Sequence, residues 1–151
     1  SFIICAAPDY LARHGCPQQP QDLLQHAGLL PAVSAVRREL TLYRQTPGGQ
    51  PNDSIRLALP PTVLATPQIE LILAAALAGV GVAGLPSFVS AQALREGRLQ
   101  RLLPDWRGTT LNLYVAMPTR KYVPARSRVF IDFLLQTFGG NRNDPWLSGA
   151  L

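Results

Sequence analysis

The sequence predicts an α/β fold, because one stretch carries the patterns of a strand, a helix and a second strand in succession. Residues 55–59 alternate between large apolar side chains and others, as in a half-buried strand. A helix is expected to start at Thr66, whose hydroxyl suits an N-cap, with Pro67 in its first turn, and to reach about Ala78. Residues 80–85 are apolar enough for a buried strand, so the three elements predict a parallel β-α-β unit.

Apolar periodicity and turn residues predict the other elements in the same way. Further strands are expected at 2–6, 29–30, 38–44, 99–103 and 111–117. Further helices are expected at 8–14, 21–26, 87–95 and 124–138. Clusters of proline and glycine predict a loop over 47–53, a break at 60–61 and the end of the last helix at 139–141.

The composition describes a globular chain that carries little charge. The 151 residues are 47% hydrophobic and 15% charged, whereas about 25% charged is ordinary, so we do not expect disorder in the body of the chain. Such a low charged fraction suggests surface that a missing segment or a partner subunit covers. The net charge is +5, but the basic residues are scattered and make no run of about five to eight, so we expect no nucleic-acid patch.

The sequence lacks the usual catalytic and metal-binding patterns. It has no nucleophile elbow, phosphate-binding loop or HExxH motif, and its two cysteines and two histidines lack zinc-ligand spacing. Gly79, Gly81 and Gly84 mimic a dinucleotide fingerprint, but they follow a helix and enter a strand, the reverse of the required order. Close packing of helix and sheet explains them better. We therefore expect no enzyme activity, no cofactor and no metal.

Cys5 and Cys16 leave two interpretations open. If they lie close together they can form a regulatory disulfide; otherwise Cys5 is a small core residue and Cys16 a turn residue. Their low number fits a reducing compartment. No signal peptide is visible, and the most apolar stretch, 69–89, holds Glu70 and several glycines and prolines, which argues against a membrane span. A cytoplasmic location is expected.

The starts of two predicted helices mark a candidate ligand site. In an open α/β sheet, ligands bind at the carboxyl ends of the strands, beside helix N-termini with open N–H groups. The helices after Thr66 and after Pro86 both start in such a place, and the hydroxyls of Thr66 and Ser87 can hydrogen-bond a carboxylate. Both hydroxyls can equally serve as helix caps and nothing more.

Five segments resemble those of LysR-type transcriptional regulators. They are APDYLARHGCPQQPQDL (7–23), AAALAGVGVAGLP (74–86), LREGRL (94–99), LPDW (103–106) and the stretch 122–138. Their order and spacing match that family's effector-binding domain over residues 2–138. The resemblance implies a regulatory domain that senses a small molecule to control transcription.

The resemblance also implies the periplasmic-binding-protein-like (type 2) fold, in which two α/β lobes, joined by two crossover strands, enclose a ligand cleft. The winged helix-turn-helix that reads DNA, and the opening part of the first lobe, would then lie upstream of Ser1. The implied assignment is 1–6 first crossover strand, 7–81 complete Rossmann-like second lobe, 82–85 second crossover strand, 86–138 C-terminal part of the first lobe, and 139–151 tail.

Under this resemblance, two short segments supply the effector contacts that the chain holds. The residues are Ala65, Thr66, Pro67, Gln68, Leu85, Pro86 and Ser87. They imply a weakly polar pocket without a charged anchor, for an organic acid or an aromatic metabolite. Loop 31–36 departs from the family's common pattern, which leaves its contribution open.

The implied partners are a small-molecule effector and further copies of the chain, as a homodimer or tetramer. DNA would be bound only through the N-terminal winged helix-turn-helix. Two alternatives stay open: an oligomerisation module that binds little ligand by itself, and a solute-binding protein, which would need a leader and a complete first lobe. An enzyme of similar lobe fold is a weaker alternative, because no acid–base constellation supports it.

Overall fold

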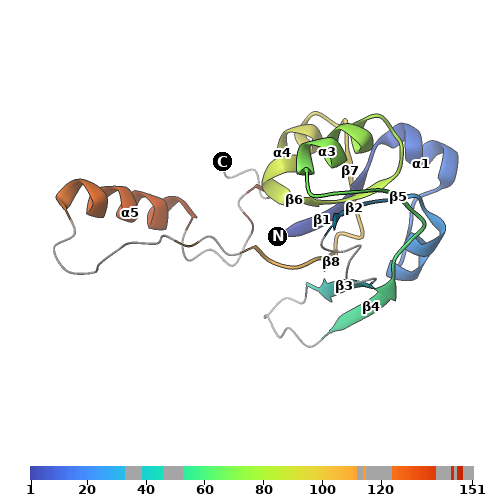
Figure 1. Ribbon diagram of the computed structural model, residues 1–151, viewed down its shortest axis with the longest axis horizontal. Coiled ribbons are helices and arrows are strands. Elements are labelled where there is room, and N and C mark those ends of the chain that lie inside the picture. Colours follow the sequence, from blue (N-terminus) through green and yellow to red (C-terminus); the bar gives the residue numbers. More distant parts are fainter. Residues whose placement is uncertain are drawn as a thin grey trace. The chain divides into compact units, whose positions relative to one another are not determined.

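The computed structural model describes residues 1–32, 39–45, 53–111, 114, 124–138, 144 and 146–147, and it falls into two compact units. Unit 1 is Ser1–Thr110 and unit 2 is Leu111–Leu151. In the described part of unit 2, α5 (Ala125–Phe138) confirms the predicted last helix (Figure 1). Most of the predicted strand at 111–117, most of the loop at 47–53 and the residues 139–141 lie outside the described residues.

A five-stranded sheet forms the centre of unit 1. Its strands are β1 (Phe2–Ala6), β2 (Gly28–Pro31), β5 (Thr62–Thr66), β6 (Val82–Pro86) and β7 (Gln100–Leu102), in the order β5-β2-β6-β1-β7. Strand β2 runs parallel to both β5 and β6, and β1 runs antiparallel to β6 and β7. The carboxyl ends of β2, β5 and β6 therefore meet at one edge of the sheet.

The β-α-β unit exists, but its first strand is not the predicted one. Residues 62–66, for which no strand was predicted, form β5, which pairs with β2. Strand β4 (Ser54–Ala58) instead joins a second, antiparallel sheet with β3 (Glu39–Arg44) and β8 (Trp106–Arg107), in the order β4-β3-β8. Pairing with the distant β2 makes residues 62–66 a strand, and local sequence patterns do not report such pairing.

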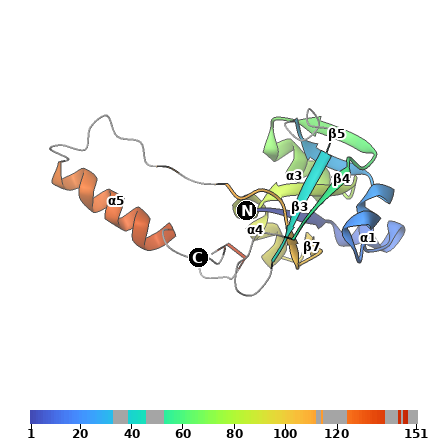
Figure 2. The ribbon, with the colours of Figure 1, turned by 90° about the horizontal axis from the view of Figure 1, so that it is seen from below.

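Two apolar clusters cover the two faces of the five-stranded sheet, because neighbouring residues of each strand point to opposite faces. Cys5 and Ala83 pack under α3 (Ile69–Leu77) and α4 (Ser87–Arg95). Ile4 and Val82 pack with α1 (Pro8–His14), the 3₁₀-helix η1 (Pro20–Gln25) and the second sheet. Figures 1 and 2 show α3 and α4 on one side of the sheet and β3 and β4 on the other.

The start of α3 differs from the prediction, whereas α4 spans the predicted residues. Gln68 is the N-cap of α3, so Thr66 and Pro67 precede the helix. Thr66 ends β5 instead, and its Oγ1 accepts a hydrogen bond of 3.2 Å from the N–H of Gln68. The hydroxyl thus stabilises the turn from strand to helix rather than the first helical turn itself.

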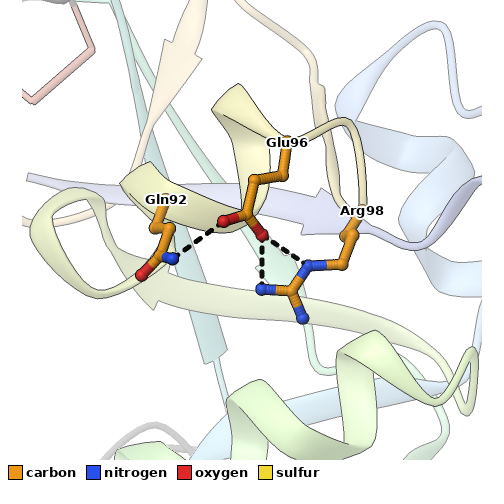
Figure 3. Close-up of polar contacts among 3 residues, drawn as sticks. All are labelled: Gln92, Glu96 and Arg98. Atoms are coloured by element: carbon orange, nitrogen blue, oxygen red, sulfur yellow. Dashed lines mark hydrogen bonds and ion pairs between the residues drawn. The ribbon is translucent and has the colours of Figure 1, made fainter.

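An exposed polar cluster follows α4 (Figure 3). The carboxylate of Glu96 accepts hydrogen bonds from Gln92 Nε2 at 2.8 Å and Arg98 Nε at 2.7 Å. These two bonds, that of Gln92 first, hold the pKa of Glu96 below its ordinary value. Gly97 has φ +69, a left-handed conformation that suits glycine and ends the helix.

Gly81 is required by a close approach between two backbone segments. A Cβ atom at this position would overlap the carbonyl oxygen of Ala27. That oxygen also accepts a 2.8 Å hydrogen bond from the N–H of Val82, which fixes the two segments together. At Gly84, by contrast, a Cβ would meet no atom within 4 Å. Only the first of these two glycines is therefore needed for packing.

The substitution Gly81→Ala is expected to destabilise the chain by about 1–3 kcal/mol, because the atom it would meet is backbone and cannot rotate away. Gly84→Ala is the matched control and should change the free energy of unfolding by less than about 1 kcal/mol. Urea denaturation measures both. Equal effects of the two substitutions would contradict the close approach.

The two cysteines lie in different environments, and both are free thiols. Cys5 is completely buried in β1, and burial raises the pKa of its thiol to about 12. Cys16 is exposed beyond the end of α1. The interpretation of Cys5 as a core residue and Cys16 as a turn residue fits this arrangement.

A thiol reagent at pH 8 is expected to modify one cysteine of the folded chain and both after unfolding, because only a thiolate reacts and the Cys5 thiol stays protonated. Cys16→Ser should abolish the reaction of the folded chain and leave that of the unfolded chain. Two rapidly reacting thiols in the folded wild type would show that Cys5 is accessible.

Candidate functional site

The carboxyl ends of three parallel strands define one edge of unit 1, which we call the carboxyl edge: Pro31 of β2, Thr66 of β5 and Pro86 of β6. The register pairs Pro31 with Thr66. Helices α3 and α4 begin directly beyond β5 and β6. The two predicted segments, 65–68 and 85–87, therefore span the ends of strands that meet at this edge, the place where ligands bind in open α/β sheets.

On the β5 side, most of the predicted residues are accessible. Ala65, Pro67 and Gln68 are exposed, whereas Thr66 is only 8% exposed. A hydroxyl that accepts one hydrogen bond can still donate its own proton, so the bond from Gln68 N–H does not exhaust Thr66. The first N–H groups of α3 have no partner within the helix, and they add donors here.

On the β6 side, the predicted residues are interior. Leu85 and Ser87 have no exposed surface. The N–H of Ser87 donates to the Ser1 carbonyl oxygen at 2.8 Å, and the Ser1 amino group donates to Ser87 Oγ at 3.4 Å. Ser90 Oγ lies 3.2 Å from the carbonyl oxygens of Pro86 and of Ser87. In this conformation the segment organises the start of α4 and offers little surface to a ligand.

Two further residues lie at the same edge. Pro31 was expected in the loop 31–36, whose contribution was left open, but it ends β2, which lies between its two parallel neighbours β5 and β6. Phe88, in the first turn of α4, is 50% exposed. A large aromatic residue directly after the Pro86–Ser87 helix start was the available signal for it.

The charge at the carboxyl edge is asymmetric. Glu70, which is exposed, lies in the first turn of α3, whereas α4 has no acidic residue in its first turn. A carboxylate at a helix N-terminus satisfies part of the positive end of the helix dipole and repels a second anion. An anionic ligand would therefore meet repulsion from Glu70 beside the donors of α3.

A shallow cavity with a volume of about 470 Å³ lies away from the carboxyl edge, at the C-terminal end of α3. Arg13 and Gly79 line it, and Arg13 Nη2 donates a 3.0 Å hydrogen bond to the Gly79 carbonyl oxygen. Among the described residues, no three His, Cys, Asp or Glu side chains gather as a metal site. In the same residues, no helix has the length and hydropathy to cross a membrane.

Comparison with known proteins identifies relatives of this chain. The family model described as the LysR substrate binding domain matches residues 1–139. The chain is 32% identical over 121 residues to an uncharacterized HTH-type transcriptional regulator of Haemophilus influenzae, covering 80% of this chain and 40% of that protein. It is 31% identical over 142 residues to the regulator YhjC of Escherichia coli, covering 89% and 43%. The chain thus spans less than half the length of these relatives.

Solved structures resemble it as well. The CrgA regulatory domain of Neisseria meningitidis, a LysR-type transcriptional regulator, matches with a TM-score of 0.62 and 26% identity, over 91% of this chain and 65% of that chain. The regulatory domain of AphB from Vibrio vulnificus matches with a TM-score of 0.67 and 20% identity, over 90% and 64%. These matches confirm the predicted periplasmic-binding-protein-like α/β class. The chain therefore belongs to the LysR substrate-binding-domain family of transcriptional regulators.

Proposed function

We propose that this chain is the effector-sensing part of a LysR-type transcriptional regulator that acts in the cytoplasm and catalyses no reaction. The observation that carries the proposal is the carboxyl edge, where Pro31, Thr66 and Pro86 end three parallel strands beside two helix starts. The effector class we propose is an organic acid or an aromatic metabolite. DNA would be bound by an N-terminal winged helix-turn-helix of the parent protein.

Within this proposal, segment 65–68 makes the direct contacts. Thr66 and Gln68 supply hydrogen-bonding side chains, and the first N–H groups of α3 supply backbone donors. Because Leu85, Pro86 and Ser87 are buried, their proposed role is to shape the edge, beside which Phe88 is half-exposed. A neutral or singly charged aromatic ligand suits these residues better than a polyanion does, because the carboxylate of Glu70, in the first turn of α3, would repel a polyanion.

The lobe boundaries remain part of the proposal. The resemblance assigns 7–81 to the second lobe and 86–138 to the first, joined by crossover strands at 1–6 and 82–85. The boundary between the two compact units lies later in the chain than these lobe boundaries, between Thr110 and Leu111. Residues 87–107 contribute α4, β7 and β8 to unit 1, and Leu99 packs in the same cluster as Cys5.

Regulation would follow from a ligand that prefers one arrangement of the parent protein over another, since only differential affinity shifts an equilibrium. A coupling of about 1–3 kcal/mol is typical of such switches. The full-length regulator, as a dimer or tetramer on DNA, would convert effector binding into a change of transcription.

Calorimetric titration of the full-length regulator with candidate organic acids and aromatic acids tests the site. Once a binding compound is found, Thr66→Val and Gln68→Ala are each expected to weaken its affinity roughly tenfold or more, because each removes a hydrogen bond worth about 1.5–3 kcal/mol when the partner is charged. Gln92→Ala, which changes an exposed glutamine in the second turn of α4, is the matched control and should leave the affinity unchanged.

An unchanged affinity in both the Thr66 and Gln68 variants, with their folding intact by circular dichroism, would move the effector site away from the carboxyl edge. If the regulator folds normally but binds none of the compounds, the result would favour a second candidate function, oligomerisation.

That second candidate is an oligomerisation module. Helix α5 carries an apolar stripe of Val129, Phe130, Phe133 and Leu134 at helical spacing, which a second copy of the chain would cover. Light scattering on the chain is expected to give a monomer mass if sensing is its main role, and a dimer or larger mass, independent of any ligand, if association is.

A further inference from the structure

A buried hydrogen-bonded cluster joins α1 to the start of β2. Tyr10 of α1 is 2% exposed, and His26, which follows η1, is 6% exposed. Tyr10 Oη lies 3.3 Å from His26 Nδ1 and accepts a 3.0 Å hydrogen bond from the N–H of Ala27. The rings of Tyr10 and His14 stack with their centroids 4.3 Å apart. We call the Tyr10, His26 and Ala27 contacts the latch.

The count of donors around Tyr10 Oη favours a neutral His26 whose Nδ1 carries no proton. The oxygen of Tyr10 receives the proton of Ala27 N–H, so the tyrosine's own hydroxyl proton is available for His26 Nδ1. A neutral imidazole can accept it, whereas a protonated imidazole is a donor at both nitrogens. Protonated His26 would place a second N–H donor, in addition to that of Ala27, against Tyr10 Oη. The hydroxyl proton of Tyr10 would then have to rotate away from His26 within a buried site.

The latch holds the point where β2 enters the sheet. The carbonyl oxygen of Ala27 accepts a 2.8 Å hydrogen bond from Val82 N–H, and the N–H of Gly28 donates a 2.8 Å bond to the Pro61 carbonyl oxygen. These two bonds begin the pairing of β2 with β6 and with β5. A change at His26 or Tyr10 therefore reaches both neighbours of β2 through the single peptide group that joins Ala27 to Gly28.

The charges around His26 oppose its protonation on balance. Burial is the largest cause that lowers the pKa of His26 below its ordinary value of 6.5, and the charge of His14 acts in the same direction. Asp22 of η1 acts in the opposite direction. Asp22 already accepts hydrogen bonds from the backbone N–H groups of Gln18 and Gln19, at 2.9 and 3.1 Å.

The other charged groups on the packed elements point away from the latch. Strand β4, which contacts η1, carries Arg56, an exposed residue on the face opposite to the buried Leu57. On α1, Asp9 and Arg13 are exposed, and Arg13 bonds the Gly79 carbonyl oxygen and the Asp9 carbonyl oxygen.

We propose that Tyr10, His26 and Ala27 form an acid-sensitive latch, in which protonation of His26 breaks the Tyr10–His26 hydrogen bond and loosens the entry of β2 into the sheet. The far end of β2 is Pro31, at the carboxyl edge, so the latch links acidity to the strand that ends there. Testing the latch requires no effector, and its outcome is independent of the proposed ligand site.

The sign of the pH effect follows from linkage. As the pH falls, the unfolded chain binds a proton at His26 before the folded chain does, because the folded-state pKa is the lower one. The folding equilibrium constant therefore falls once the pH drops below about 6.5, by up to about tenfold per pH unit, and levels off below the folded-state pKa. The pKa values of Asp22 and Glu96 are lowered from 3.8 and 4.5, so the stability that these two carboxylates contribute is lost only as the pH falls below about 4.5.

Nuclear magnetic resonance titration of the imidazole protons of the full chain gives the first measurement. His26 is expected to titrate below 6.5, and the amide protection of Ala27 and Gly28, corrected for intrinsic exchange, is expected to fall through the same midpoint. The amide of Ile4, which lies in the β1–β6 pairing, serves as the internal reference for global unfolding and should lose protection only as far as the folding equilibrium constant falls. A His26 midpoint at or above 6.5, or losses of protection of equal size at Ile4, Ala27 and Gly28, would overturn the latch.

Substitution supplies the second measurement. His26→Asn keeps an amide that can accept the Tyr10 proton but cannot titrate, so its folding equilibrium constant should lose most of the decline between pH 6.5 and 5 that the wild type shows in urea denaturation. His14→Asn is the comparison variant: it removes only the smaller of the two causes that lower the pKa of His26, so it should retain most of that decline. If His26→Asn keeps the full wild-type decline, the latch is wrong; if it does not fold, the titration of the wild type decides alone.

Discussion

The parallel pairing of β2 with two neighbours is the constraint on which unit 1 depends. Four residues, Gly28–Pro31, lie between β5 and β6, and the strand has its partners on both sides. Such a short strand contributes few hydrogen bonds of its own, so its ends must be fixed by other contacts. Ala27 and Gly28 provide them at one end, and the Pro31–Thr66 pairing provides them at the other. The layers of α3 and α4 and of the second sheet are assembled around this strand.

Elements with strong local signals could be predicted from the sequence. Helices α1, α4 and α5 begin at or next to Pro8, Pro86 and Pro124, and apolar runs gave β1 and β6. The sequence did not indicate which strands pair with one another. Residues 62–66 have the composition of a strand but follow two prolines, and only the presence of β2 beside them makes them β5. The same limit hid the second sheet, in which β8 has two residues.

The sequence could place the candidate residues at helix starts beyond strands, but it could not predict their exposure. Thr66 and Ser87 were selected for their hydroxyl groups, and both proved to be largely buried. Position along a strand decides whether a side chain points to the core or to solvent, and a shift of one residue moves the side chain to the opposite face. Because β5 extends to Thr66, the accessible positions are those on either side of it, Ala65 and Pro67.

This alternation has an evolutionary consequence for the carboxyl edge. Thr66 supports the turn into α3, so its replacement affects folding as well as any contact made there. Ala65, Pro67 and Gln68 are exposed and contribute nothing to the apolar clusters. Selection can therefore vary these three positions among descendants of one ancestral chain and change the proposed effector surface, while the scaffold beneath is inherited unaltered.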